Sequence, residues 1–177
     1  MEAAKEFFPN IDFTKFWSHY QDYVNPNPVT DEMVAQAEAA CGYKLPKAYI
    51  ALMKTQNGGD PSKVAFPTTK PTSWSNNHIQ ITSVHPIGTN NCISSLDMIE
   101  EWQYPKIGLV LCECPSGGHD VVMLDYSESG PQGEPKIIHY DQELEEYTFL
   151  AKNVQDFING LVDPEVFEIS EKDDASD

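Results

Sequence analysis

The sequence has few basic residues, no long apolar run and little cysteine. Its 177 residues carry 11 lysines and arginines against 28 acids, which gives a formal net charge of −17. A surface that follows a nucleic-acid backbone needs clustered lysine and arginine, so this balance argues against nucleic-acid binding and favours a basic partner. The alternative is that the acidity serves solubility alone, as in many soluble proteins. No stretch reaches the roughly 18 apolar residues of a membrane span, and the N-terminus lacks the basic and apolar regions of a signal peptide. We therefore expect a cytoplasmic protein that does not bind membranes.

Four cysteines are too few and too scattered for a disulfide framework in a chain of this length without a secretion signal. We expect them to be reduced. The sequence also lacks a glycine-rich phosphate loop, an H-E-x-x-H zinc motif and a G-x-S-x-G nucleophile motif. Because no convergent catalytic set is evident, we predict a protein that is not an enzyme and uses no cofactor.

Helical patterns dominate the first half of the chain. Residues 13–24 repeat apolar side chains at helical spacing, and Asp12 precedes them as an N-cap. Thr30 is the predicted N-cap of a second helix of about three turns, which Gly42 ends.

A third helix is predicted from Pro46, since proline is tolerated in a first turn, to a left-handed cap at residues 57–59 (Asn-Gly-Gly). Residues 60–75 are rich in proline, threonine and serine and predict an irregular loop, followed by a short strand at residues 79–81. A fourth helix is expected around residues 96–102, opened by a capping box.

Strand patterns dominate the second half. Three apolar segments between turns predict an antiparallel meander at residues 106–114, 119–127 and 136–142. Asn153 is the predicted cap of a last helix with one apolar stripe. We therefore predict an α+β fold, a single domain over residues 1–163 with a central, mainly antiparallel sheet flanked by N-terminal helices and a C-terminal helix. Residues 164–177 are expected to form a flexible acidic tail.

The segment CECPSGGHDVVMLDY, at residues 112–126, concentrates cysteine, histidine and aspartate. Alternate residues of a strand share a face, so Val110, Cys112 and Cys114 are predicted to point together into the core as small hydrophobes. The alternative is a metal site. A structural zinc ion usually has four nitrogen or sulfur ligands, and C-x-C with one nearby histidine supplies at most three. We therefore predict that no metal binds there.

Catalysis is the other alternative for this segment. A Cys/His nucleophile would draw on His119 and Asp120, and Asp125 would form an acid/base pair with Asp141 or Glu143. Both ideas have ordinary competitors, since the intervening residues are typical of a plain turn and acids at strand ends are commonly solvated. We therefore predict no catalytic residue.

Three strings, in order along the chain, resemble one known family. YKLPKAYIALMKTQNGG at residues 43–59 is similar to a helix with a Leu-Pro start and an Asn-Gly-Gly end. Residues 112–143 resemble a central hairpin with recurring positions at Gly118, Asp120, Leu124 and Asp125. Residues 149–162 resemble a closing helix. Together, over residues 13–162, they resemble the SUKH superfamily in its Smi/Knr-like branch.

The resemblance implies a SUKH-like α+β domain without an established catalytic site. Bacterial members are similar to immunity proteins of polymorphic toxin systems, which bind and neutralise toxin domains such as nucleases and deaminases. A toxin that binds nucleic acid is basic, so the acidity of this chain fits such an inhibitor. We expect a monomer or weak dimer whose partner is a cognate, basic toxin domain.

The partner-binding residues are predicted on the central hairpin as an acidic face of Asp120, Asp125, Glu128 and Glu134. Trp74 is a candidate for an exposed anchor beside it, and the alternative is a loop aromatic that packs on the sheet. Two other functions stay open. One is a regulatory scaffold of the fungal cell-wall type, and the other is a Cys/His hydrolase.

Overall fold

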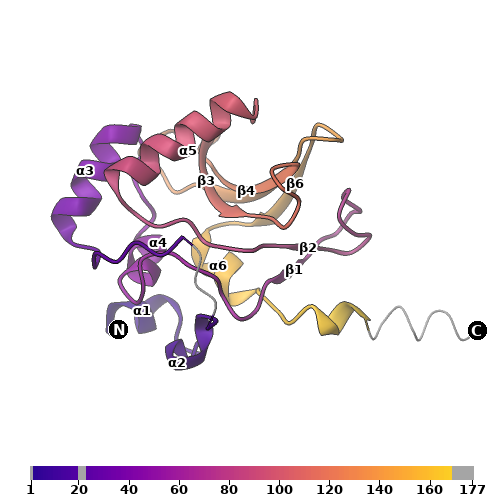
Figure 1. Cartoon of the computed structure of the whole chain (residues 1–177), viewed down its shortest axis with the longest axis horizontal. Helices are drawn as coiled ribbons and strands as arrows, with labels where there is room; N and C mark the ends of the chain where they lie inside the picture. The colour runs from indigo at the N-terminus through magenta and orange to yellow at the C-terminus, as the bar shows by residue number, and fades with distance from the viewer. Residues whose placement is uncertain (1, 20–22, 169–177) are drawn as a thin grey trace, which may run out of the picture.

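A computed structural model describes residues 2–19 and 23–168 (Figure 1). The labelled helices of this part of the chain are Glu2–Phe7 (α1), Phe13–Phe16 (α2), Asp31–Cys41 (α3), Lys47–Met53 (α4), Thr89–Glu101 (α5) and Val154–Asn159 (α6), and residues 165–168 are also helical. Its strands are Ala65–Pro67 (β1), His78–Gln80 (β2), Gly108–Glu113 (β3), Asp120–Asp125 (β4), Lys136–Asp141 (β5) and Glu146–Ala151 (β6). None of the described helices combines the length and the apolar character needed to cross a bilayer.

The central element is a four-stranded antiparallel sheet in the order β3-β4-β5-β6. β1 and β2 pair separately as a short antiparallel ribbon. The predicted α+β class is confirmed, but the sheet has one strand more than the predicted meander. β6 was missed because residues 149–151 were assigned to the closing helix, which begins only at Val154. The loop predicted over residues 60–75 also contains a strand, β1.

The two faces of the sheet bury different sets of side chains. On one face the main core joins β-strand residues to α1, α3, α4 and α6, with Leu52, Leu124, Ile137 and Phe157 among its members. On the other face a second cluster joins the C-terminal half of α5 to the sheet: Ile99, Tyr104, Val110, Val121, Met123, Ile138 and Tyr140. Figure 1 shows α5 and α6 on opposite sides of the sheet.

Local capping signals place several helix ends correctly. Thr30 Oγ1 accepts a hydrogen bond from the Met33 backbone N–H at 3.1 Å, and Gly42 ends α3 with a left-handed φ of 78°. Asn153 Oδ1 accepts from the Asp156 N–H at 2.8 Å. These predictions are confirmed. They could be made from the sequence because both partners of each cap lie within a few residues of each other.

Tertiary pairing overrides the predicted first helix. α2 starts at its Asp12 cap but ends at Phe16, so the prediction of a helix to residue 24 is wrong. Trp17 is extended, with φ −85° and ψ 135°, and forms an antiparallel bridge with Pro61. Its indole N–H donates to Thr55 Oγ1 at 3.1 Å. Residues 20–22 lie outside the described part of the chain.

The predicted left-handed cap of the third helix is also wrong. α4 ends at Met53, and its C-cap residue Lys54 is right-handed. The following Asn57 has another role, because its buried side-chain amide donates to Ile87 O at 2.9 Å and accepts from Ile87 N–H at 2.7 Å. It thereby joins two segments that are 30 residues apart. The fourth helix, α5, begins at Thr89 rather than near residue 96, without a side-chain cap.

A β-bulge corrects the predicted face of the cysteines. Val110 pairs with Met123 and Cys112 pairs with Val122, so the register shifts between them. Val110 consequently faces the second cluster, whereas Cys112 and Cys114 face the main core. All four cysteines are buried and free, as expected for small apolar side chains.

Candidate functional site

The cysteine-, histidine- and aspartate-rich segment forms the end of β3, a turn and the start of β4. In the turn, Gly118 has a φ of 101°, and a Cβ there would lie 3.0 Å from the Trp102 ring. Only glycine suits both the left-handed backbone and this close approach. Tyr104 Oη donates to Gly118 O at 2.5 Å, and the Asp120 N–H donates to Ser116 Oγ at 3.1 Å. These contacts fix the turn over the sheet.

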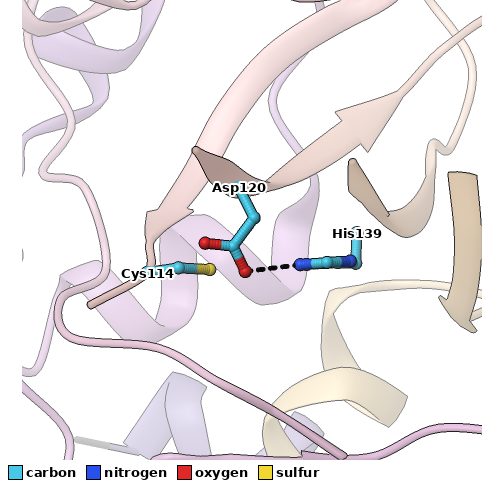
Figure 2. Close-up of side chains that lie close together, drawn as sticks. All are labelled: Cys114, Asp120 and His139. Atoms are coloured by element: carbon cyan, nitrogen blue, oxygen red, sulfur yellow. Dashed lines mark hydrogen bonds and ion pairs between the residues drawn. The ribbon is translucent and has the colours of Figure 1, made fainter. Parts of the chain in front are cut away.

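Figure 2 shows that β3, β4 and β5 bring together Cys114, Asp120 and His139. His139 Nε2 donates to Asp120 Oδ2 at 2.6 Å, and all three side chains are buried. The sequence did not indicate His139, because it lies 19 residues from Asp120 and becomes its neighbour only through strand register. In that register His139 stands opposite Val122, two residues along β4.

Three potential metal-ligand atoms meet here, each within 4.8 Å of the others. Their spacing fits a hydrogen-bonded group better than a coordination shell. Oxygen and nitrogen ligands of a tetrahedral zinc ion lie about 3.3 Å apart, as zinc–ligand bonds of about 2.0–2.1 Å require. The 2.6 Å contact between Asp120 and His139 is shorter than this spacing. Asp120 therefore acts in this arrangement as a buried hydrogen-bond acceptor.

The same geometry disfavours a cysteine nucleophile. Burial raises the pKa of the Cys114 thiol well above its ordinary value, and the neighbouring Asp120 carboxylate raises it further. The reactive form of a cysteine is the thiolate, so this environment suppresses its chemistry. The predicted partner His119 is exposed instead, and its Nδ1 lies 3.2 Å from Glu143 Oε1.

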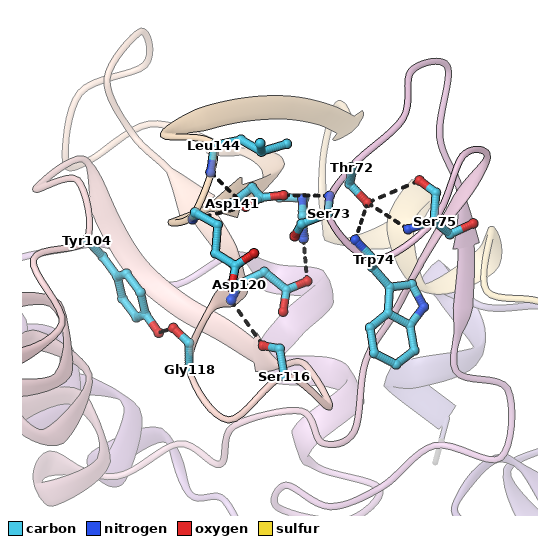
Figure 3. A network of polar contacts seen from close by, with 12 residues as sticks. Thr72, Ser73, Trp74, Ser75, Tyr104, Ser116, Gly118, Asp120, Asp141 and Leu144 are labelled. Carbon is cyan, nitrogen blue, oxygen red and sulfur yellow. Dashed lines mark hydrogen bonds and ion pairs between the residues drawn. The ribbon is translucent and has the colours of Figure 1, made fainter.

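Asp141 organises the turn between β5 and β6 and a neighbouring loop (Figure 3). Its carboxylate accepts backbone N–H bonds from Ser73 at 2.8 Å, Glu143 at 3.1 Å and Leu144 at 3.2 Å. Burial acts to raise its pKa, but the hydrogen bonds from Ser73 and Leu144 outweigh burial and lower the pKa. In the register Asp141 stands opposite Asp120, whereas Asp125 stands opposite Lys136. The suggested acid/base pair of Asp125 with Asp141 therefore does not form.

Two of the four acids that were predicted to form an exposed acidic face are buried. Asp120 and Asp125 are only 3% and 5% exposed. Asp125 Oδ1 accepts from the Ser127 N–H at 2.8 Å, and its other oxygen lies 3.6 Å from Lys136 Nζ. Asp125 stabilises its turn, because a strand-end carboxylate can accept a backbone N–H group that a turn leaves unpaired. The Asp120 carboxylate accepts from His139 instead. The sequence pattern alone did not separate these acids from solvated ones.

The other two acids, Glu128 and Glu134, are exposed. Glu128 is paired with Lys136, which also faces Asp125, so one lysine partly neutralises this hairpin. Partial burial raises the pKa of the Glu134 carboxyl. Whether either residue binds a partner stays a prediction.

Trp74 lies in the loop between β1 and β2 and is 39% exposed. The loop is attached to the large sheet twice, through Ser73 to Asp141 and through a 2.6 Å ion pair of Lys70 with Glu146.

Trp74 also borders a surface hollow beside Phe167, whose ring stacks on His78 with centroids 4.2 Å apart. Phe167 shows that the first residues of the predicted tail contact the domain, and residues 169–177 lie outside the described part. The use of Trp74 as an anchor stays a prediction.

A protein-family model described as SMI1-KNR4 cell-wall, of the SUKH group, matches residues 31–158. The chain belongs to the SMI1/KNR4 family. The match begins at α3 and extends into α6, so it includes the whole four-stranded sheet and confirms the resemblance drawn from the sequence. A comparison with individual curated proteins finds no match.

Proposed function

We propose that this SMI1/KNR4 family member is a non-enzymatic protein-binding module that binds and neutralises a basic toxin domain. The observation that carries the proposal is the net charge of −17 on a chain of this family. Such a charge attracts a basic partner over long distances and accelerates its association. A nuclease or deaminase domain that binds nucleic acid would have a surface of the required sign.

The buried Cys114, Asp120 and His139 group supports a binding role over hydrolysis. A nucleophile must meet its substrate, and these three side chains are enclosed by the sheet and the turn before β4. The exposed surface, by contrast, is rich in carboxylates. Such a surface can bind a partner of opposite charge.

A regulatory scaffold is the second candidate, because the description of the matching family refers to the cell wall. A scaffold would bind its own partners without protecting a cell against a toxin. Growth protection therefore distinguishes the two functions.

The test is co-expression with a basic toxin domain of the nuclease or deaminase type, starting with any that a neighbouring gene encodes. We expect this protein to restore growth and to elute with the toxin domain as one complex in gel filtration. Association should slow as salt rises, because the Debye length is only about 10 Å at 0.1 M ionic strength. Absence of both protection and a complex would contradict the proposal and favour the scaffold.

A further inference from the structure

The face of the sheet that carries the second cluster is covered unevenly. α5 contacts β3, at one edge of the sheet, and supplies Ile99 to the cluster. At the other edge, Tyr147 and Phe149 of β6 stand opposite Tyr140 and Ile138 of β5 and continue the same face. They are 50% and 55% exposed.

β6 is an edge strand, since it pairs only with β5 among the described strands. Leu144, in the turn before it, is 52% exposed. Single exposed apolar side chains are ordinary, whereas three large ones within residues 144–149 form a patch of the kind that marks an interaction site. Aromatic side chains are also the commonest anchors of protein interfaces.

Carboxylates surround this patch. Glu143 and Glu145 are exposed and flank Leu144. Glu146 is also exposed, but it alternates with Tyr147 along β6, so it points to the other face, where it pairs with Lys70 at 2.6 Å. The Tyr147 ring packs against Tyr140, with ring centroids 5.3 Å apart. Burial raises the pKa of Tyr140, and Tyr147 and the negative charge of Glu145 raise it further. The combination suits a partner surface with lysine or arginine side chains. Their charged groups would pair with the acids, and their apolar stems or cation–π contacts would meet the aromatic rings.

The turn that carries the patch is held rigidly. Asp141 accepts the backbone N–H groups of Glu143 and Leu144, and its third bond, from Ser73, attaches the neighbouring loop. A preordered surface loses less conformational entropy on binding than a mobile one.

We propose that Leu144, Tyr147 and Phe149, with Glu143 and Glu145, form the surface that binds the basic toxin domain. We call these five residues the β6 surface. This inference rests on the proposed function and replaces the hairpin acids Asp120 and Asp125 as the centre of the interface. The aromatic rings supply most of the affinity, and the glutamates supply the rate of encounter.

The test measures binding of the purified toxin domain to the full chain and its variants. Tyr147→Ala with Phe149→Ala should weaken binding at least tenfold, mainly through faster dissociation. Glu143→Lys with Glu145→Lys should slow association at least fivefold and flatten its salt dependence. On binding, the backbone amides of β6 should become protected from hydrogen exchange.

Matched controls lie on other surfaces. Ile93→Ala removes an apolar side chain of similar exposure from α5, and Glu128→Lys with Glu134→Lys reverses two acids on the β4–β5 hairpin. Each control should change affinity less than twofold, and circular dichroism should show every variant folded.

Each outcome of this test decides something different. If the unmodified chain binds and the Tyr147 and Phe149 variant binds equally well, the β6 surface is overturned while the proposed function stands. The same holds if the hairpin controls cause the larger loss. If the unmodified chain does not bind the toxin domain, both proposals fail. Self-association that the Tyr147 and Phe149 variant abolishes in sedimentation velocity would instead assign the surface to a second copy of this chain.

Discussion

The two turns at opposite ends of β5 are both stabilised by a buried aspartate, but the charges around the two aspartates differ. Each adjoins a buried aspartate that accepts backbone N–H groups, Asp125 at the β4–β5 turn and Asp141 at the β5–β6 turn. At the first turn Lys136 faces Asp125 and Glu128. At the second, Asp141 accepts the backbone N–H groups of Ser73, Glu143 and Leu144, and exposed glutamates fill the turn around it.

The difference shows how the fold separates structural acids from acids available to a partner. A buried carboxylate is stable when hydrogen bonds replace its lost hydration, whether or not a cation is present. The acids that remain exposed then set the surface charge. At the β4–β5 turn Lys136 offsets that charge. At the β5–β6 turn Lys70 offsets the charge of Glu146, and the acids left beside Tyr147 are Glu143, whose neighbour is His119, and Glu145.

The largest expected effect comes from removing the aspartate of each turn. Asp141→Ala deprives three buried or turn N–H groups of their acceptor and should lower the free energy of unfolding by about 2–4 kcal/mol. Asp125→Ala removes the hydrogen bond from the Ser127 N–H and should cost about 1–2 kcal/mol. Urea unfolding measures both. An equal or larger loss for Asp125→Ala would break the comparison.

The effect of Asp141 should also depend on pH. Its folded pKa is lowered from the ordinary value of 3.8, so the unfolded chain binds the proton more readily than the folded one. The stability that this ionised carboxylate contributes is present above pH 3.8 and is lost as pH falls through the folded pKa. The gap in stability between the unmodified chain and Asp141→Ala should therefore narrow from about pH 6 to about pH 3. A gap that is independent of pH would contradict this assignment.

Features encoded by neighbouring residues could be predicted from the sequence, as Thr30 and Asn153 show, and the family resemblance gave the fold class. Features that depend on distant partners could not. Trp17 ends a helix by pairing with Pro61, and Asp120 is buried because strand register brings it to His139. The sequence placed Asp120 on the surface because acids at the start of a strand are ordinarily solvated, and no local signal reports a partner on the neighbouring strand, 19 residues along the chain.

The charge difference between the turns can be narrowed by Lys136→Met, which keeps the apolar stem and removes the cation. Hydrogen bonding to Glu128 and the charge of Asp125 raise the pKa of Lys136, so it is charged in the folded protein. Its loss should lower stability by up to about 1 kcal/mol, the usual limit for a partly exposed pair. Binding of the toxin domain should stay within twofold, because the β4–β5 turn lacks the aromatic patch. A large gain in affinity would mean that charge alone directs the partner.

The smallest effect concerns the backbone of the turns. Gly130 takes a left-handed φ of 74° at the β4–β5 turn, whereas at the β5–β6 turn Glu145 has a φ of 51°. A non-glycine residue in this region is strained by about 1–2 kcal/mol, and glycine recovers only part of that because it gains entropy in the unfolded chain. Glu145→Gly should therefore raise the free energy of unfolding by a few tenths to about 1 kcal/mol. Gly130→Ala, the matched change, should lower it by about 1 kcal/mol. Thermal unfolding measures both, and if Glu145→Gly destabilises the protein, the glutamate side chain must stabilise the turn by contacts that outweigh its strain.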